Sequence, residues 1–463
     1  MNERVRVLNG WPLRTKGRYV VYWAQMNRRV DSNHALAYAA GLANDCKLPL
    51  LFYEGLTCSY PYANDRLHTF LLEGVPETAR RLKNAGIGYV FHLRRRKSDP
   101  NDALYRLAEQ AAAIVTDDYP TFIARLHNTS VPAKVGIPYH AVDASCVIPM
   151  SLFEKREYAA YTIRPKIRRL LPKYLKPWPC ARPDRDFTAK AGRFLHTRVT
   201  DQNIAELVKS CEIDHDVPPS ASFRGGRLEA ERLLDLFLRQ NLRRYASQRN
   251  EPSAQATSNL SPYLHFGHIS SLEIALAVRD YAGKHKLIAE EFLEELIVRR
   301  ELAFNFTRHT PDLDSLESLP EWAGKTLKRH AKDSRDPSYS RAQFEHAATH
   351  DELWNATQRE LLLRGKIHGY YRMYWGKKII EWSRTHEEAL AVMIYLHDRY
   401  ALDGRDPNTY TNILWCFGLH DRPWRERPIF GSVRFMSLAG MRRKTDVDAY
   451  IKEIAEAESR VSP

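Results

Sequence analysis

The sequence predicts a Rossmann-like α/β domain with a parallel sheet, followed by a larger all-α domain. Three observations carry this prediction. Short β-rich runs alternate with amphipathic stretches over residues 17–149, a segment rich in Pro, Gly and charge follows, and from about residue 226 the apolar spacing is helical almost throughout. We therefore divide the chain into an α/β domain (1–171), a linker (172–225) and a helical domain (226–463).

Apolar runs bounded by turn-forming residues predict the strands, because strands buried on both faces are apolar throughout. They lie at residues 17–23, 48–54, 88–94, 112–118 and 140–149. Amphipathic stretches predict helices at residues 31–46, 65–86 and 99–112. We expect Asp31 or Ser32 to cap the first of these helices, and Asp99 or Asn101 the third. No GxGxxG motif follows the first strand, so a dinucleotide fingerprint is absent.

The linker and the helical domain differ in composition. Residues 171–193 and 217–226 are rich in Pro, Gly and charge, as expected of a long crossing between domains. Residues 290–306 and 369–382 instead carry apolar side chains three and four positions apart, which predicts amphipathic helices.

Composition narrows the class of protein. The 463 residues are 44% hydrophobic and 27% charged, as in soluble globular proteins, and the net charge of +14 favours a polyanionic partner, most simply nucleic acid. The six cysteines lie far apart without a CxxC pair, so we expect neither a metal site nor a disulfide framework. Neither an apolar run of about 20 residues nor a signal peptide is found, which predicts a cytoplasmic protein without a membrane span.

Tryptophans gather near the C-terminal end of the sequence. Five of the nine fall between residues 354 and 424: Trp354, Trp375, Trp382, Trp415 and Trp424. Each one alone is more simply a core residue, since Trp is highly buried on average. A cluster can also offer stacking faces for bases or relay single electrons to a redox cofactor.

The helical half also contains a hydroxyl-rich segment, residues 243–271. Thr257, Ser258 and Ser261 precede a predicted helix, where hydroxyls and free backbone N–H groups can cradle phosphate. The alternative is a plain helix cap. The run from His265 to His268 matches the HxGH motif of class I aminoacyl-tRNA synthetases, but it lies in the helical half and no KMSKS-like loop follows, so its context argues against that function.

Two further groups combine charge with apolar neighbours. Glu295 and Arg299 are four residues apart and would share a helix face, either as a solvated ion pair or with a partly buried carboxyl able to donate a proton. Arg372 and Asp403 lie on separate predicted segments beside tryptophans, where such a pair can balance a cofactor that gains negative charge.

Together these segments resemble class II cyclobutane pyrimidine dimer photolyases of the photolyase–cryptochrome superfamily, over nearly the whole chain. The resemblance rests on RVDSNHAL and IVTDD in the α/β half, then EYAAYTIRPKIRRLLPKYL, RRYASQRNEP, TSNLSPYLHFGHIS, EELIVRREL, HGYYRMYW, DGRDPN and HDRPW. The TSxLSPYLxxG pattern is specific to the superfamily, and YYRMYW followed by DGRDPNxY points to class II.

The resemblance implies a U-shaped FAD in the helical domain and light-driven repair of cyclobutane dimers in DNA. Excited, reduced FAD would donate an electron to a dimer flipped out of the base stack, and the electron would return after the ring splits. By this resemblance the FAD would be held by Tyr245, Thr257, Ser258, Asn259, Leu260, Ser261, Arg372, His397 and Asp403.

The same resemblance implies the remaining roles. Glu295 matches the carboxyl group that bonds the base of the dimer, and Met373 and Trp415 match residues that pack against it. The relay that photoreduces oxidised flavin would consist of Trp375, nearest the cofactor, followed by Trp354 and Trp382.

Two positions depart from the family pattern. His397 stands in YLHDRY where relatives carry an asparagine facing the reactive nitrogen of the flavin. A histidine there either tunes the flavin through its own charge or simply fills the space and donates the same hydrogen bond. Arg299 stands near the dimer site where some relatives place an aromatic residue.

The partners follow from the same resemblance. We expect UV-damaged DNA, single- or double-stranded, contacted mainly at its phosphates by the basic segments RMYWGKK, DRPWRERP and MRRKTD. An antenna chromophore, a deazaflavin or FMN, can lie in the α/β domain, and we expect a monomer. The alternatives are a cryptochrome-like photoreceptor, for which a long divergent C-terminal tail would be expected, and a (6-4) photolyase, for which we find no histidine pair.

Overall fold

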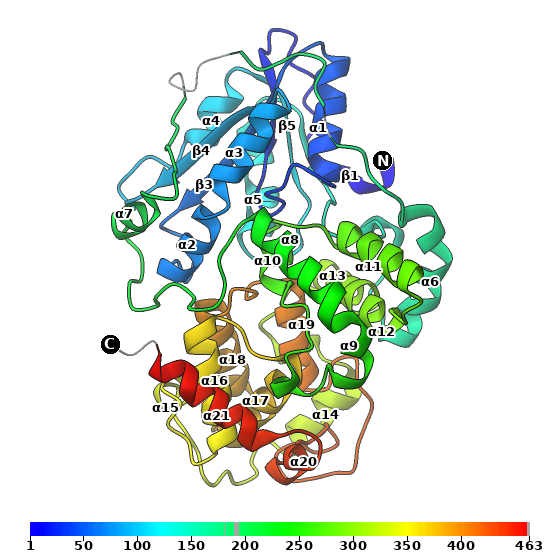
Figure 1. Cartoon of the computed structure of the whole chain (residues 1–463), viewed down its shortest axis with the longest axis vertical. Coiled ribbons are helices and arrows are strands. Elements are labelled where there is room, and N and C mark those ends of the chain that lie inside the picture. Colours follow the sequence, from blue (N-terminus) through cyan, green and yellow to red (C-terminus); the bar gives the residue numbers. More distant parts are fainter. Residues whose placement is uncertain (181, 189–193, 461–463) are drawn as a thin grey trace.

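The computed structural model describes residues 1–180, 182–188 and 194–460. A sheet domain and a helical domain lie at opposite ends of the longest axis (Figure 1). This confirms the predicted fold class, whereas the exact division at residues 171 and 225 stays a prediction. Among the described residues, no helix is both long and apolar enough to cross a bilayer.

The sheet has six strands in the order β1-β6-β5-β2-β3-β4. Its strands are β1 (Val5–Val7), β2 (Tyr19–Trp23), β3 (Leu50–Thr57), β4 (Gly88–Arg94), β5 (Ala111–Asp117) and β6 (Tyr139–Val142). The five predicted strands pair in parallel, while the short edge strand β1, which was not predicted, pairs with β6 antiparallel. The central strands β2 and β5 are buried along their whole length, which explains their continuous apolar runs.

Helices cover both faces of this sheet (Figure 1). They are α1 (His34–Asp45), α2 (Asp65–Leu72), α3 (Val75–Asn84), α4 (Ala103–Ala108) and α5 (Phe122–Ser130), with short 3-10 turns η1 (Asn2–Arg4), η2 (Pro132–Lys134) and η3 (Met150–Leu152). The helix predicted over residues 65–86 is divided at Gly74, because Pro76 fits only the first turn of a new helix. Both predicted caps were wrong: Asn33 caps α1 with its side chain, and Asp102 stands at the N-cap of α4.

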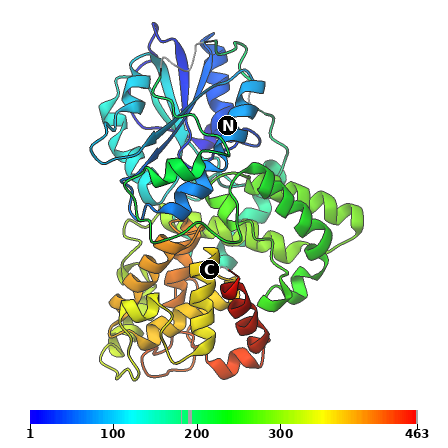
Figure 2. The same cartoon turned by 60° about the vertical axis from the view of Figure 1, so that its left-hand side comes forward.

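The chain crosses to the second domain through α6 (Ala160–Tyr174), α7 (Ile204–Lys209) and irregular segments. The green helices that follow lie beside the yellow-to-red ones, both below the sheet domain (Figure 2). The first group is α8 (Arg227–Leu236), η5 (Phe237–Asn241), α9 (Leu242–Gln248), η6 (Pro252–Ala254), α10 (Ser261–His265), α11 (Ser271–His285), α12 (Glu290–Leu293), η7 (Glu294–Arg299) and α13 (Arg300–Arg308).

The second group is η8 (Leu316–Ser318), α14 (Glu321–Arg329), α15 (Arg341–Glu345), α16 (Glu352–Arg364), α17 (Gly369–Trp382), α18 (His386–Tyr400), α19 (Pro407–Cys416), α20 (Leu438–Arg442) and α21 (Val447–Ser459). The core of the first group continues into the α/β domain, whose Phe70, Phe91 and Val147 belong to it, whereas the second group has a separate core. Helix α13 of the first group packs against α19 of the second, so the two groups meet along this pair.

Buried hydrogen bonds join the α/β domain to the helical domain. The Tyr119 hydroxyl, just after β5, donates to Asp406 Oδ2 at 2.7 Å at the start of α19. Arg66 on α2 is 1% exposed, and its guanidinium donates to the carbonyls of Leu361 and Tyr400. These contacts link the α/β domain directly to α16, α18 and the start of α19.

Candidate functional site

A cavity of about 580 Å³ opens between the two groups of helices. Its walls come from α9, α10, η7, α17, α18 and α19, so segments far apart in the sequence converge on it. Ten of the fifteen predicted site residues line it: Tyr245, Thr257, Ser261, Glu295, Arg372, Met373, Trp375, His397, Asp403 and Trp415.

The other five predicted residues lie just behind this wall. Ser258, Asn259 and Leu260 belong to the turn before α10, in which Asn259 has a φ of 56°, a left-handed conformation that Asn tolerates better than most residues. The Thr257 hydroxyl donates to Asn259 Oδ1 at 3.3 Å and so holds this turn together. Trp354 is buried in the core next to Trp375, and Trp382 is buried next to Trp354.

An ion pair spans the cavity wall between α17 and the turn before α19. Arg372 Nη2 donates to both carboxylate oxygens of Asp403 at 3.1 Å, and the Ser261 hydroxyl donates to Asp403 Oδ2 at 2.7 Å. Burial raises the pKa of Asp403, but the charges of Arg372 and Lys366 and the bond from Ser261 outweigh it and hold this pKa at about 2. The pair predicted from the sequence is therefore formed, with its carboxylate ionised.

His397 is almost completely buried in the cavity wall, with 2% of its surface exposed. Its Nδ1 lies 3.1 Å from the carbonyl of Met393 one helical turn earlier, so this nitrogen carries the proton and donates. Burial lowers the pKa of His397 to about 3, which keeps the ring neutral near pH 7. Nε2 is consequently an acceptor, and within the described part of the chain it has no partner.

Three tryptophans form a continuous file away from the cavity. The ring of Trp375 stacks on that of Trp354 with centroids 6.2 Å apart and planes 4° from parallel, and Trp354 meets Trp382 at 6.2 Å. Trp354 Nε1 donates to the carbonyl of Trp375, and Trp375 Nε1 donates to Gln358 Oε1 at 2.9 Å. The three rings are thus fixed in contact, with Trp375 at the cavity and Trp382 3% exposed at the far end.

Glu295 stands at the mouth of the cavity and differs from its predicted pairing. Its side chain is 44% exposed, and Oε1 accepts a hydrogen bond from Arg249 Nη1 at 2.8 Å. The expected pair with Arg299 is not formed, because residues 294–299 form a π-helical turn instead of an α-helical one. Five residues apart on that turn, Arg299 approaches Glu294 at 3.6 Å.

The lining of the cavity also includes polar residues that were not predicted from the sequence: Arg300, Lys366 and His368. Four buried side-chain atoms of its lining find no partner among the described residues, namely Arg300 Nε, His368 Nε2, Arg372 Nε and His397 Nε2. Buried polar groups are rarely left unpaired, so their convergence indicates a polar ligand. Only the basic character of the segment before GYYRMYW hinted at Lys366 and His368.

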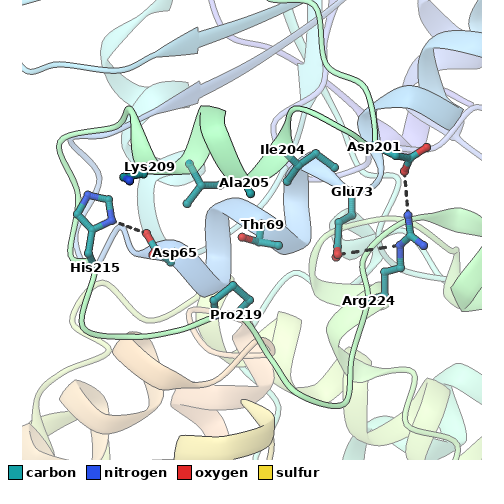
Figure 3. Close-up of a pocket in the computed structure, with 11 residues that line it drawn as sticks. Asp65, Thr69, Glu73, Asp201, Ile204, Ala205, Lys209, His215, Pro219 and Arg224 are labelled. Carbon is teal, nitrogen blue, oxygen red and sulfur yellow. Dashed lines mark hydrogen bonds and ion pairs between the residues drawn. The ribbon is translucent and has the colours of Figure 1, made fainter. Parts of the chain in front are cut away.

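A second cavity of about 720 Å³ lies between α2, α7 and the segment that follows α7 (Figure 3). Most of its charged groups pair with each other: Asp65 pairs with His215 at 2.7 Å, and Arg224 pairs with Asp201 at 2.8 Å and with Glu73 at 4.0 Å. None of its lining side chains has a buried polar atom without a partner in the described chain. The smaller cavity is therefore the better candidate site.

Comparison with known proteins decides the family. The DNA photolyase family model matches residues 20–184. The deoxyribodipyrimidine photo-lyase of Methanothermobacter thermautotrophicus is 41% identical over 98% of both chains, and that of Arabidopsis thaliana is 38% identical over 97% of this chain and 92% of the relative. The chain belongs to the photolyase–cryptochrome superfamily. The family predicted from the sequence motifs is thereby confirmed.

The fold agrees with this family. An archaeal photolyase from Sulfolobus tokodaii, solved with two FAD molecules, superposes with a TM-score of 0.66 and 18% identity, over 96% of this chain and 92% of the other.

FAD is the cofactor of this family, and the residues of the cavity suit it. FAD carries two phosphates, ring carbonyls and ring nitrogens, which need donors and acceptors on several sides. The unpaired atoms of Arg300, His368, Arg372 and His397 supply them, and the Lys366 ammonium faces the same space.

Proposed function

We propose that the protein repairs cyclobutane pyrimidine dimers in DNA, driven by light absorbed by FAD in the cavity of α9, α10 and α17–α19. The observation that carries this proposal is the shared lining of one cavity. The predicted dimer-contacting residues Glu295, Met373 and Trp415 face the same space as six of the nine predicted flavin contacts. Bound in its reduced form, FAD supplies one electron on excitation by near-UV or blue light.

The residues on the flavin side bind the cofactor and fix its charge. Asp403 holds the Arg372 guanidinium in place at the cavity wall, where its charge favours an anionic reduced cofactor. Tyr245, Thr257 and Ser261 complete the wall near the start of α10. The apolar packing of Trp375 against Trp354 excludes water from the inner end.

The residues at the mouth receive the dimer. Among the described residues only Oε1 of Glu295 is bonded, by Arg249, so Oε2 can bond a pyrimidine that enters the cavity. Met373 and Trp415 offer apolar faces against which a flipped base can pack. Arg422, Arg425 and Arg427, in the predicted basic segment DRPWRERP, are exposed and can contact the phosphates of damaged DNA.

The decisive experiment is illumination of the purified protein with an oligonucleotide that contains one dimer, under reducing conditions. We expect loss of dimers only in the light, and a smaller yield in Glu295→Gln, which retains size and FAD binding but not the carboxylate. A dark incubation and Glu290→Gln, a change on the neighbouring α12, are the matched controls. Binding of FAD without light-dependent loss of dimers would support the cryptochrome-like photoreceptor instead.

Three finer points belong to the same proposal. The protein acts as a monomer on single- or double-stranded DNA, in a reducing cytoplasm. The α/β domain holds an antenna chromophore, either a deazaflavin or FMN. The absorption spectrum of the extracted chromophores distinguishes these two from FAD alone, and sedimentation in solution measures the mass of the particle.

A further inference from the structure

Trp415 and Trp375 line the same cavity but lie in opposite electrostatic surroundings. Two cations lie over the ring of Trp415: Lys377 Nζ at 5.2 Å from its centroid and Arg434 Cζ at 5.3 Å. Cations within about 6 Å of an aromatic face interact strongly with its π electrons. Any positive charge formed on this indole would therefore be opposed from two directions.

Lys377 is an unusual residue to find here. Its side chain lies on α17, is 0% exposed, and donates to the backbone carbonyl of Cys416. The nearby carboxylate of Asp421 is occupied by Arg434, at 2.8 and 2.9 Å, and in the described chain Lys377 forms no ion pair. Burial lowers the pKa of Lys377 to about 8, so it still carries its charge at pH 7. Burying an ammonium without a counter-ion is costly, which calls for a function of that charge.

Trp375 has none of these cations. Over the described residues no Lys or Arg lies on its ring, and its neighbours are the ring of Trp354 and the neutral His397 at 5.0 Å. Its indole N–H donates to Gln358 Oε1 at 2.9 Å. An oxygen acceptor on this N–H stabilises positive charge on the indole, whereas the cations on Trp415 destabilise it.

We propose that Lys377, together with Arg434, prevents Trp415 from acting as an electron donor, so that oxidation of the cavity wall is confined to Trp375. The oxidant is photoexcited oxidised flavin, which takes one electron from an indole. The radical cation of Trp375 is reduced by one electron from Trp354, and the oxidised Trp354 is reduced in turn by one electron from Trp382. At Trp415 the radical cation would form beside two positive charges, and Trp415 instead stays neutral as a packing face.

This inference rests on the proposed function only in requiring FAD in the cavity; it involves no DNA. The test starts from Trp375→Phe, which cuts the relay and lengthens the fluorescence lifetime of bound oxidised FAD. Adding Lys377→Met, similar in length but uncharged, is expected to shorten that lifetime several-fold and to produce the transient absorption of an indole radical cation. Adding Trp415→Phe to this pair should restore the long lifetime.

The matched control is Lys378→Met in the same Trp375→Phe background. Lys378 is the next residue of α17 and 7% exposed, but it lies over Trp382 at 5.3 Å and pairs with Glu381. Removing the charge of Lys378 should leave the fluorescence lifetime of FAD unchanged, because Trp375→Phe already separates Trp382 from the flavin.

Two results would overturn the proposal. One is an unchanged lifetime on adding Lys377→Met; the other is a shortened lifetime that persists after Trp415→Phe. Circular dichroism and FAD stoichiometry verify that each variant is folded and loaded. If Lys377→Met does not fold, Arg434→Gln can be used instead, because the Arg434 side chain is 33% exposed and carries the second cation. An unchanged lifetime in that variant would also contradict the proposal. Loss of repair with these lifetimes intact would contradict the proposed function alone.

Discussion

The ion pair between Arg372 and Asp403 makes the sharpest prediction about stability. Asp403 is 7% exposed and its pKa falls from 3.8 to about 2, which corresponds to about 2.5 kcal/mol of favourable interaction for the ionised form. Because the folded pKa lies below the unfolded one, this contribution is complete above about pH 4 and is lost as the pH falls toward 2. Measurements at pH 7 therefore report all of it.

Asp403→Asn should lower the free energy of unfolding of the FAD-free protein by about 3–5 kcal/mol, since the Arg372 charge stays in a wall where its side chain is only 15% exposed. Urea denaturation of Asp403→Asn, Arg372→Gln and the double variant gives a cycle, in which we expect a coupling of about 2–3 kcal/mol. Ser261→Ala, which removes one hydrogen bond and spares the ion pair, should cost only about 1 kcal/mol. A coupling below about 0.5 kcal/mol would refute the reasoning, because independent sites are additive within that margin.

Three further predictions use the same cavity. Trp382→Phe should strongly slow the photoreduction of oxidised FAD, followed by absorbance, yet leave repair by pre-reduced protein unchanged; equal loss of both would contradict the relay. Between about pH 6.5 and pH 3, His397 binds a proton in the unfolded protein but not in the folded one. The free energy of unfolding therefore decreases as the pH falls through this range, by up to about 1.4 kcal/mol per pH unit. In urea titrations between pH 7 and 5, the free energy of unfolding of His397→Asn should depend less steeply on pH. Gly376→Ala places a Cβ 2.8 Å from Cys416 Sγ and should cost about 1–3 kcal/mol and weaken FAD binding in fluorescence titrations, whereas Gly324→Ala, with open space around it, should do neither.

The strands could be predicted because burial on both faces leaves a continuous apolar run. The run over residues 17–23 predicts β2 within two residues, and the alternation with helices predicts parallel pairing. Edge strand β1 could not be recognised in this way. It has only three residues, Val5–Val7, partly exposed and paired on one side, so it carries no periodic pattern that differs from a loop.

The ion pair between Arg372 and Asp403 could be predicted for a different reason. Arg372 and Asp403 are 31 residues apart, and no helical spacing joins them; the family motifs YYRMYW and DGRDPN place them in the site. For Lys377, in the next helical turn, the sequence predicted a contact with DNA phosphates as part of RMYWGKK, and this prediction is wrong because its side chain is 0% exposed. Its importance depends on which ring and which carbonyl it meets, and Cys416, its hydrogen-bond partner, lies 39 residues away.

At the mouth of the cavity, residue spacing along the sequence does not predict which charged side chains pair. An α-helix places residues i and i+4 on one face, and by that rule Glu295 and Arg299 would pair with each other. The π-helical turn at residues 294–299 adds one residue to the turn, so Arg299 meets Glu294 at 3.6 Å instead. Glu294 is itself held by Arg164 at 2.6 Å, which anchors the turn to α6. Glu295 instead bonds Arg249 at 2.8 Å, so the position of the carboxylate that we propose receives the dimer depends on a single extra residue in the turn.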